Sequence, residues 1–195
     1  TWIGPSPEGM DRLGNKPEAR NTMQAAGVPV IPGTKEPVFD WETGLSEADR
    51  IGFPVMIKAA LGGGGKGMRM AETRGEFQSA FQTAQKEAKS SFADGTMYVE
   101  RLIRHPRHVE FQIMADSFGN VIHLGERDCS IQRNHQKMIE ESPCVAIDDT
   151  LRDRMGSAAV RAAKAAHYVN AGTIEFLLEP EGYFYIMVMN TRIQV

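Results

Sequence analysis

The residues with the strongest chemical signal form a glycine-rich loop around one lysine. An apolar run that contains Lys58 is followed by Gly62, Gly63, Gly64, Gly65, Lys66 and Gly67. Glycine backbone N–H groups can approach a polyphosphate closely while a lysine neutralises its charge. Gly67 stands where a Walker A loop needs Ser or Thr, and a strand-like run follows where a dinucleotide-binding turn needs a helix. The segment predicts a loop that covers phosphates, with a flexible linker as the alternative.

A second set of polar residues lies along a predicted strand over residues 107–115. Strand alternation places His108, Glu110 and Gln112 on one face and three apolar residues on the other. This polar face either binds a ligand or is exposed to solvent.

The segment from 126 to 137 gathers polar groups able to bind anions, metals or protons, and we expect an irregular functional loop there. Its His135 and Lys137 suit phosphate or bicarbonate. Its Cys129 is expected to be a small buried side chain and not a nucleophile.

The last predicted hairpin could hold a divalent cation. One strand places Thr173, Glu175 and Leu177 on a common face, and the other is expected to do the same with Phe184, Ile186, Val188, Asn190 and, if it continues, Arg192. Because Mg²⁺ is commonly held by one or two carboxylates plus substrate phosphates, Glu175 opposite Asn190 suggests a magnesium site. An ordinary hairpin with an exposed glutamate is the alternative.

The elements that must position these residues can be predicted from periodicity and capping signals. Helices are expected at 16–26, 74–90 and 149–167, with a connector at 28–50 that contains one short helix. The second helix starts with a capping box, Thr73 to Glu76, and has apolar residues at helical spacing. Strands are expected at 53–59, 68–72, 97–103, 107–115, 120–126, 171–178 and 183–190. Hairpins flanked by helices, without regular βαβ alternation, predict an α+β fold.

Composition narrows the function classes. The 195 residues carry 22 Lys+Arg and 25 Asp+Glu, a net charge of −3, which argues against nucleic-acid binding. There is no apolar run long enough for a membrane span and no signal-peptide pattern, so we expect a soluble protein with no membrane association. The two cysteines, Cys129 and Cys144, fit a reducing compartment better than a disulfide framework.

In their order along the chain, these segments resemble the biotin carboxylase family, the ATP-grasp component of acetyl-CoA, propionyl-CoA, methylcrotonyl-CoA and pyruvate carboxylases. The matching segments are Ile3 to Pro5, Gly14 to Lys16, the glycine-rich loop after Lys58, Pro106 to Glu110, Glu126 to Lys137, Ala171 to Phe176 and Met189 to Val195. The resemblance implies an internal fragment of an α+β ATP-grasp protein. Residues 1–30 would be linker helices, 31–102 the lid subdomain, and 103–195 the first part of a truncated C-terminal subdomain, without the N-terminal Rossmann-like subdomain.

The resemblance also implies a reaction and roles for individual residues. The parent enzyme would use ATP, Mg²⁺ or Mn²⁺ and bicarbonate to carboxylate carrier-bound biotin through carboxyphosphate. Lys16 and Lys58 would contact ATP phosphates under the lid loop, Gly62 to Gly67. The adenine would be held by Glu100, Arg101 and Ile103, and the ribose and phosphate path would be lined by His108, Gln132 and His135. Bicarbonate would be received by Lys137, Arg192, Gln194 and Val195, and the metal site would include Glu175 and Asn190.

Departures from the family pattern limit what this chain is expected to do alone. The family's second metal-binding glutamate falls at Val188, and milder changes occur at Leu61, Asn15 and Asn134. The segment with the base that deprotonates bicarbonate would begin just after Val195. We therefore expect the isolated chain to be inactive.

The resemblance implies partners and a location as well. They are a biotin carboxyl carrier, a carboxyltransferase component, a homo-oligomeric parent enzyme, and the bacterial cytoplasm, with a mitochondrion as the alternative. Two other functions stay open: another bicarbonate-using ATP-grasp ligase, such as a carbamoyl-phosphate synthetase, and a catalytically dead nucleotide-binding paralogue.

Overall fold

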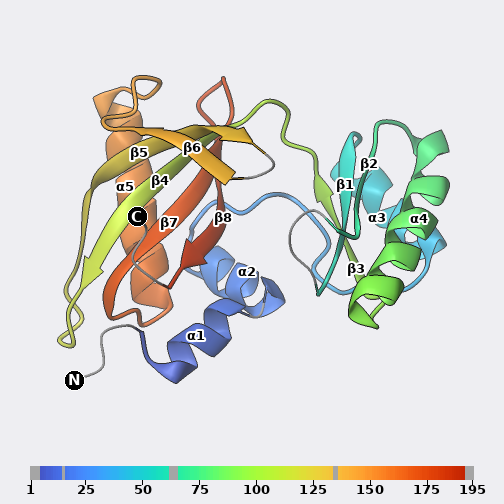
Figure 1. Ribbon diagram of the computed structural model, residues 1–195, viewed down its shortest axis with the longest axis horizontal. Helices are drawn as coiled ribbons and strands as arrows, with labels where there is room; N and C mark the ends of the chain where they lie inside the picture. The colour runs from blue at the N-terminus through green and yellow to red at the C-terminus, as the bar shows by residue number, and fades with distance from the viewer. Residues whose placement is uncertain (1–4, 15, 62–65, 134–135, 192–195) are drawn as a thin grey trace. The chain divides into compact units, whose positions relative to one another are not determined.

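The computed structural model describes residues 5–14, 16–61, 66–133 and 136–191, which fall into two compact units (Figure 1). One unit is Ile31–Ile103, and the other combines Thr1–Val30 with Arg104–Val195. Each has its own sheet and its own hydrophobic core. All the pairs of named strands are antiparallel, which confirms the predicted α+β class. None of the described helices is long and apolar enough to cross a membrane.

The unit Ile31–Ile103 is a three-stranded sheet with helices on one face. Its strand order is β2 (Met68–Ala71), β1 (Val55–Ala59) and β3 (Met97–Arg101). Val55, Ile57 and Ala59 are buried in the core, whereas Met56 and Lys58 are only half-buried. This alternation is that of a strand covered on one side, and it leaves Lys58 on the side away from the helices.

Two helices, α3 (Trp41–Ile51) and α4 (Arg74–Phe92), complete this core. The predicted apolar stripe of α4 is confirmed, with Phe77, Phe81, Ala84 and Ala88 buried. The predicted capping box is not formed. Thr73 makes no side-chain cap hydrogen bond, and the Glu76 carboxylate accepts from the backbone N–H of Glu72 at 3.0 Å and not from that of Thr73.

The other unit is built on a five-stranded antiparallel sheet. Its order is β6 (Gln136–Glu141), β5 (Val121–Arg133), β4 (Arg107–Ala115), β7 (Asn170–Leu178) and β8 (Phe184–Asn190). The described part of this unit contains the helices α1 (Pro7–Gly14), α2 (Lys16–Ala25) and α5 (Asp149–Ala165). α1 lies in the span expected to hold linker helices, but no bounds were predicted for it. Figure 1 shows α5 running along one face of the sheet.

The core of this unit lies between α5 and the sheet. Val109, Phe111 and Ile113 of β4 are fully buried in one cluster with the alanines of α5. Phe111 meets Phe176 of β7 edge to face, with ring centroids 6.0 Å apart. The alternation predicted for β4 is confirmed, so His108, Glu110 and Gln112 lie on the opposite face, which we call the polar face.

The segment 126–137 is not the irregular loop that its polarity predicts. β5 continues through Arg133 and pairs with β6, which the sequence analysis did not anticipate. Both faces of this part of β5 carry polar groups, because Asp128 pairs opposite core-facing Val109 while Arg127 pairs opposite Glu110. Hydrophobic alternation therefore gives no strand signal there.

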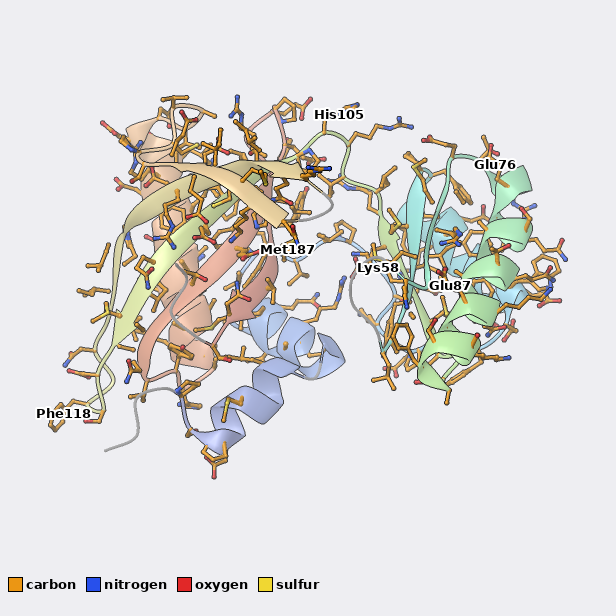
Figure 2. The ribbon with its side chains drawn as sticks, viewed as in Figure 1. Lys58, Glu76, Glu87, His105, Phe118 and Met187 are labelled. Carbon is orange, nitrogen blue, oxygen red and sulfur yellow. The ribbon has the colours of Figure 1, made fainter. Side chains whose placement is uncertain are left out.

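A bulge in β8 corrects the predicted face of the last hairpin. Val188 pairs with Glu175, but Ile186 pairs with Phe176, so Met187, which is labelled in Figure 2, has no partner in the ladder. An extra residue reverses the alternation along a strand. Phe184 and Ile186 accordingly pack in the core, while Val188 and Asn190 reach the polar face with Glu175 and Thr173.

Two buried carboxylates on the α5 side of β5 hold the segment that follows β6. Glu126 accepts from the backbone N–H of Cys144 at 3.2 Å and from Arg152 of α5 at 3.0 Å. Asp128 accepts from Arg107 at 2.8 Å, from the Ser130 hydroxyl at 2.5 Å and from the Cys144 thiol at 3.5 Å. Burial raises the pKa of Asp128, but the hydrogen bonds from Ser130 and Arg107 outweigh it and leave that pKa below its ordinary value.

Asp128→Asn tests whether the charge of this carboxylate stabilises the segment that follows β6. At neutral pH the substitution should lower the free energy of unfolding of this unit by about 2 kcal/mol, the usual scale for a hydrogen-bonded charge. Because the pKa of Asp128 is lower in the folded state than in the unfolded state, its ionised form stabilises the fold at pH values above the unfolded-state pKa of 3.8. This stabilisation is lost as the pH falls through the folded-state pKa. The difference between the two proteins should therefore hold from pH 7 to 5 and shrink below about pH 4.

The measurement is urea unfolding followed by circular dichroism in a Trp2→Phe background. In that background the fluorescence comes from Trp41, in α3. It reports the unfolding of the unit Ile31–Ile103, which Asp128→Asn should not change. Asp153→Asn, a change at an exposed carboxylate of α5, is the matched control. An equal loss at pH 7 and pH 3 would show that the charge of Asp128 is not what stabilises the segment.

Candidate functional site

The polar face carries a row of functional side chains that crosses all five strands. Three register pairs align it: Gln132 with Lys137, Glu110 with Arg127, and Glu110 with Glu175. His108 lies on the same face of β4, and β8 completes the row with Val188 and Asn190. Paired residues of neighbouring strands share a face, so the sheet itself brings these groups together.

Glu110 is the most deeply buried charged group of the row, with no exposed surface. The Arg127 Nε donates to its Oε1 at 2.6 Å, and the Lys137 ammonium donates to its Oε2. Arg127 also reaches the Gln112 amide oxygen at 3.3 Å. Two cations thus balance one buried carboxylate, which is the condition for a charge to be tolerated there.

Glu175 binds three donors from three other strands. Its Oε2 lies 2.6 Å from His108 Nε2, and its Oε1 accepts from Lys137 at 2.9 Å and from Asn190 at 2.6 Å. Burial raises the pKa of Glu175, but the hydrogen bonds from His108 and Lys137 outweigh it and lower the pKa to about 2. Glu175 is therefore ionised at every physiological pH.

The hydrogen bonds of His108 define its tautomer. Gln132 Nε2 lies 2.6 Å from His108 Nδ1 and also donates to the Cys129 carbonyl oxygen at 2.8 Å. The bond to the carbonyl oxygen fixes the orientation of the Gln132 amide. Its Nε2 is therefore a donor toward His108 Nδ1, which accepts. His108 then carries its proton on Nε2, directed at Glu175. Four residues predicted separately, His108, Gln132, Lys137 and Glu175, are joined in one network.

Lys137 stays charged in this network. Burial lowers the pKa of its ammonium, but the hydrogen bonds to Glu110 and Glu175 outweigh it and raise that pKa. A permanent cation held between two carboxylates can bind an anion such as bicarbonate or phosphate once it is released from one of them.

The donor set for a divalent cation is poor in this arrangement. Both oxygens of Glu175 already have donors, and the side chain opposite, Val188, has no atom that can bind a metal. Magnesium sites use one or two carboxylates together with substrate phosphates. The described residues therefore do not offer Mg²⁺ a site as they stand.

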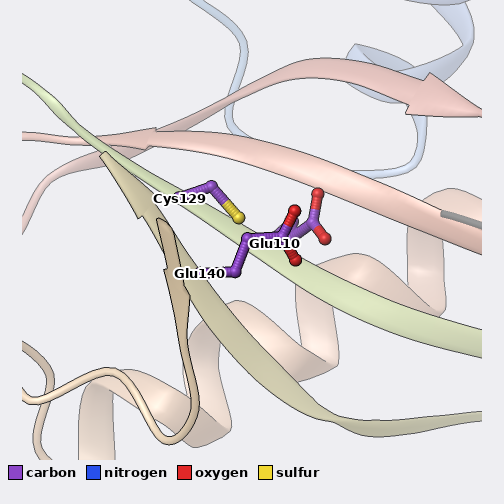
Figure 3. A group of neighbouring side chains, drawn as sticks. All are labelled: Glu110, Cys129 and Glu140. Atoms are coloured by element: carbon purple, nitrogen blue, oxygen red, sulfur yellow. The ribbon is translucent and has the colours of Figure 1, made fainter. Parts of the chain in front are cut away.

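A second group with metal-binding atoms consists of Glu110, Cys129 and Glu140 and shares Glu110 with the row (Figure 3). Glu110 is already balanced by Arg127 and Lys137. Burial, followed by the charge of Glu110, raises the pKa of the Cys129 thiol to about 12. A protonated thiol is a weak ligand, so this group is a poor donor set for a metal ion. The expectation that Cys129 is a small buried side chain is confirmed.

In the unit Ile31–Ile103, two of the predicted ATP-binding residues pair with each other. Lys58 of β1 donates to Glu100 of β3 at 2.6 Å. Figure 2 shows Lys58 on the strand side of this unit, and Glu76 and Glu87 on α4. Lys66 is exposed, whereas Gly67 is buried with φ of +67°, and a Cβ there would lie 2.8 Å from the Cβ of Ala59. Glycine is required at this end of the loop.

The remaining predicted residues are described in part or not at all. The backbone N–H of Arg101 donates to Pro32 at 2.7 Å, and Ile103 is largely buried. Lys16 begins α2, but its side chain is not described. Outside the described residues lie Gly62, Gly63, Gly64, Gly65, His135, Arg192, Gln194 and Val195.

Glu110 and Arg127 have no role predicted from the sequence. The alternation of β4 placed Glu110 on the polar face, which was the available signal. Arg127 could be paired with it only once β5 was known to continue as a strand beside β4.

Comparisons with known proteins place this arrangement in a family. Residues 15–195 match the family described as carbamoyl-phosphate synthase L chain, ATP binding domain. A biotin carboxylase of Nostoc sp. is 55% identical over 194 residues, which cover 100% of this chain and 43% of that protein. The chain thus spans less than half the length of this relative.

Solved structures of biotin carboxylases are similar to this chain in both sequence and fold. A biotin carboxylase–beta-gamma-ATP complex from Campylobacter jejuni is 51% identical, with a TM-score of 0.91 over 99% of this chain and 43% of that one. The biotin carboxylase domain dimer of the Hydrogenobacter thermophilus 2-oxoglutarate carboxylase, in complex with MgADP, ADP and bicarbonate, is 42% identical. Its TM-score is 0.90 over 100% of this chain and 43% of that one. These likenesses confirm the predicted ATP-grasp fold and the resemblance to biotin carboxylases. The chain belongs to the carbamoyl-phosphate synthase L chain ATP-binding domain family. Within this family it is a fragment of the biotin carboxylase type.

Proposed function

We propose that this chain is the ATP-binding portion of a biotin carboxylase, which uses ATP and bicarbonate to carboxylate biotin on a carrier. The observation that carries the proposal is the convergence of His108, Lys137 and Asn190 on the Glu175 carboxylate from three different strands. The resemblance assigns these residues to the phosphate path, bicarbonate and the metal site. The nucleotides and bicarbonate in the Campylobacter and Hydrogenobacter complexes support the same substrates.

The roles of individual residues follow from charge and position. Phosphoryl transfer requires mainly positioning and compensation of negative charge. Lys58 would meet the ATP phosphates and Glu100 the adenine amino group. Lys137 would receive bicarbonate, and the glycine-rich loop would close over the nucleotide and exclude the water that hydrolyses carboxyphosphate. No step is assigned to a divalent cation, because the donor set at Glu175 does not fit one.

The proposed partners are those of biotin carboxylases in general. They are a biotin carboxyl carrier and a carboxyltransferase component, within a homo-oligomeric parent enzyme. The cellular location stays a prediction from the sequence.

A second candidate function is favoured by one observation. Val188 is a neutral residue opposite Glu175, at the position where the family pattern has a metal-binding glutamate. A paralogue that binds nucleotide without turnover would tolerate this change.

A chimaeric enzyme separates the two functions. The chain would replace the corresponding span of the Nostoc biotin carboxylase, once with Val188 and once with Val188→Glu. On the first proposal the Val188→Glu chimaera forms ADP in a biotin- and bicarbonate-dependent reaction. The Val188 chimaera should be slower by at least about 100-fold, since losing even an outer-shell group of a metal site costs roughly 10- to 100-fold.

Equal inactivity of both folded chimaeras would contradict the site assignment and favour the binding-only paralogue. Formation of carbamate or carbamoyl phosphate from ATP and bicarbonate when ammonia is supplied would instead identify the carbamoyl-phosphate synthetase-like alternative.

Lys137→Ala, made in the Val188→Glu chimaera, tests the role of the central cation. Loss of the bicarbonate-binding charge should lower kcat/KM for bicarbonate by about 100-fold, or nearly 3 kcal/mol, while the Kd for ATP changes less than about threefold. The matched control is Lys164→Ala, at an exposed lysine of α5. If ATP affinity falls as far as bicarbonate use, then Lys137 is a phosphate ligand and its assigned role is wrong.

A further inference from the structure

The charged groups of the polar face alternate in sign from β6 to β7. The Arg127 Nε donates to Glu110 at 2.6 Å and lies 3.4 Å from the Oε2 of Glu140. Lys137 in turn donates to Glu110 and to Glu175. The carboxylates of Glu110 and Glu140 lie close together, with oxygen atoms within 4.8 Å of each other (Figure 3). Each of the two cations is therefore shared by two carboxylates.

The two carboxylates that share Arg127 differ in burial. The side chain of Glu110 is 0% exposed, whereas that of Glu140 is 36% exposed. Water can solvate Glu140, but Glu110 depends on cations, and a buried charge that loses its partner is strongly destabilising. If Lys137 leaves Glu110 to meet an anion, Arg127 has to stay. The position of Arg127 therefore decides how easily Lys137 can leave.

Gln112 holds Arg127 on the side of Glu110. Its amide Nε2 donates to the carbonyl oxygen of Gly172 on β7 at 3.0 Å, which fixes its Oε1 as the atom that faces Arg127. That Oε1 accepts from both Nη1 and Nη2 of Arg127 at 3.3 Å. Gln112 is on β4, two residues after Glu110, whereas Glu140 is on β6, on the other side of β5. The amide is neutral, so it orients the guanidinium without competing for its charge.

We propose that Gln112 is a positioning residue for anion binding by Lys137. It keeps Arg127 on Glu110 and away from Glu140, which leaves Lys137 free to exchange Glu110 for an anion. Without Gln112, Arg127 moves to Glu140, and Lys137 becomes the one described cation that holds Glu110. Gln112 acts through Arg127 and touches no substrate. The consequence for catalysis rests on the proposed function, in which Lys137 receives bicarbonate.

The position of Arg127 can be measured in the intact 195-residue chain, without any ligand, by NMR of the arginine Nε–Hε groups. The Arg127 resonance is assigned by its loss in Arg127→Lys. Its Hε should lie downfield and exchange slowly with water, because it is bonded to a buried carboxylate. Gln112→Met removes the amide and keeps the length of the side chain. It should move the resonance upfield and speed exchange by at least about tenfold. If Gln112→Met does not fold by circular dichroism, Gln112→Leu replaces it.

A second substitution separates positioning from a general structural effect. Gln112→Met/Glu140→Gln removes the competing carboxylate, so the Arg127 resonance and its exchange rate should return toward those of the unchanged chain. The matched control is Gln112→Met/Glu141→Gln, at the next carboxylate of β6, which pairs with Asp128 and lies on the other face. It should restore nothing. An unchanged resonance in Gln112→Met, no recovery with Glu140→Gln, or equal recovery with Glu141→Gln would each overturn the proposal.

The consequence for catalysis is measured in the Val188→Glu chimaera. There Gln112→Met should raise KM for bicarbonate by about fivefold or more, because the population with a free Lys137 is smaller. The kcat at saturating bicarbonate should change by less than about twofold, and Glu140→Gln should reverse the rise in KM. A fall in kcat with unchanged KM would refute the positioning role.

The two measurements keep this proposal separate from the proposed function. The NMR experiment needs neither ATP nor turnover, whereas the chimaeras report turnover directly. Inactive chimaeras together with the expected shift and recovery of the Arg127 resonance would refute the enzyme assignment alone. An active chimaera together with an Arg127 resonance that ignores Gln112→Met would refute the positioning role alone.

Discussion

The burial of Glu110 is the constraint on which the polar face depends. A carboxylate with no exposed surface in the centre of a sheet is tolerated only if cations and hydrogen bonds replace its water. Arg127 reaches it from β5 and Lys137 from β6, which pairs antiparallel with β5. The pairing of β6 with β5 is thus needed for charge balance as well as for the sheet. The same lysine then fixes Glu175, which extends the network to β7 and, through Asn190, to β8.

Much of the fold could be predicted where one side of an element is apolar and the other is not. α4 and β4 have this one-sided pattern, and the structure confirms them. The prediction failed where that contrast is lost. β5 carries polar groups on both faces beyond Gly125, so its continuation was taken for a loop. The bulge at Met187 could not be predicted either, because Phe184, Ile186 and Val188 alternate regularly, and only pairing with β7 reveals the reversal.

The site was predictable as a set of residues but not as a set of interactions. Each residue type indicates a chemistry by itself, and the family resemblance gives each a role. The pairing of Lys58 with Glu100 spans 42 residues, and that of Lys137 with Glu175 spans 38. Such contacts depend on the register between strands, which local sequence does not specify. This is why Glu110, with no assigned role, emerged as the residue that organises the row.

Both units contain an ion pair between a lysine and a glutamate. Each lysine is predicted to meet an anion, yet in this structure it already has an anionic partner. An incoming anion therefore exchanges one ion pair for another, and the net attraction is only the difference between them. A ligand gains more when it also satisfies the carboxylate that the lysine leaves. On the proposed assignment an adenine nucleotide would do so at Glu100, because it offers an amino group together with phosphates. Inorganic polyphosphate offers only the phosphates, so on the same assignment the ion pair that restrains Lys58 would favour the complete nucleotide over its anionic part.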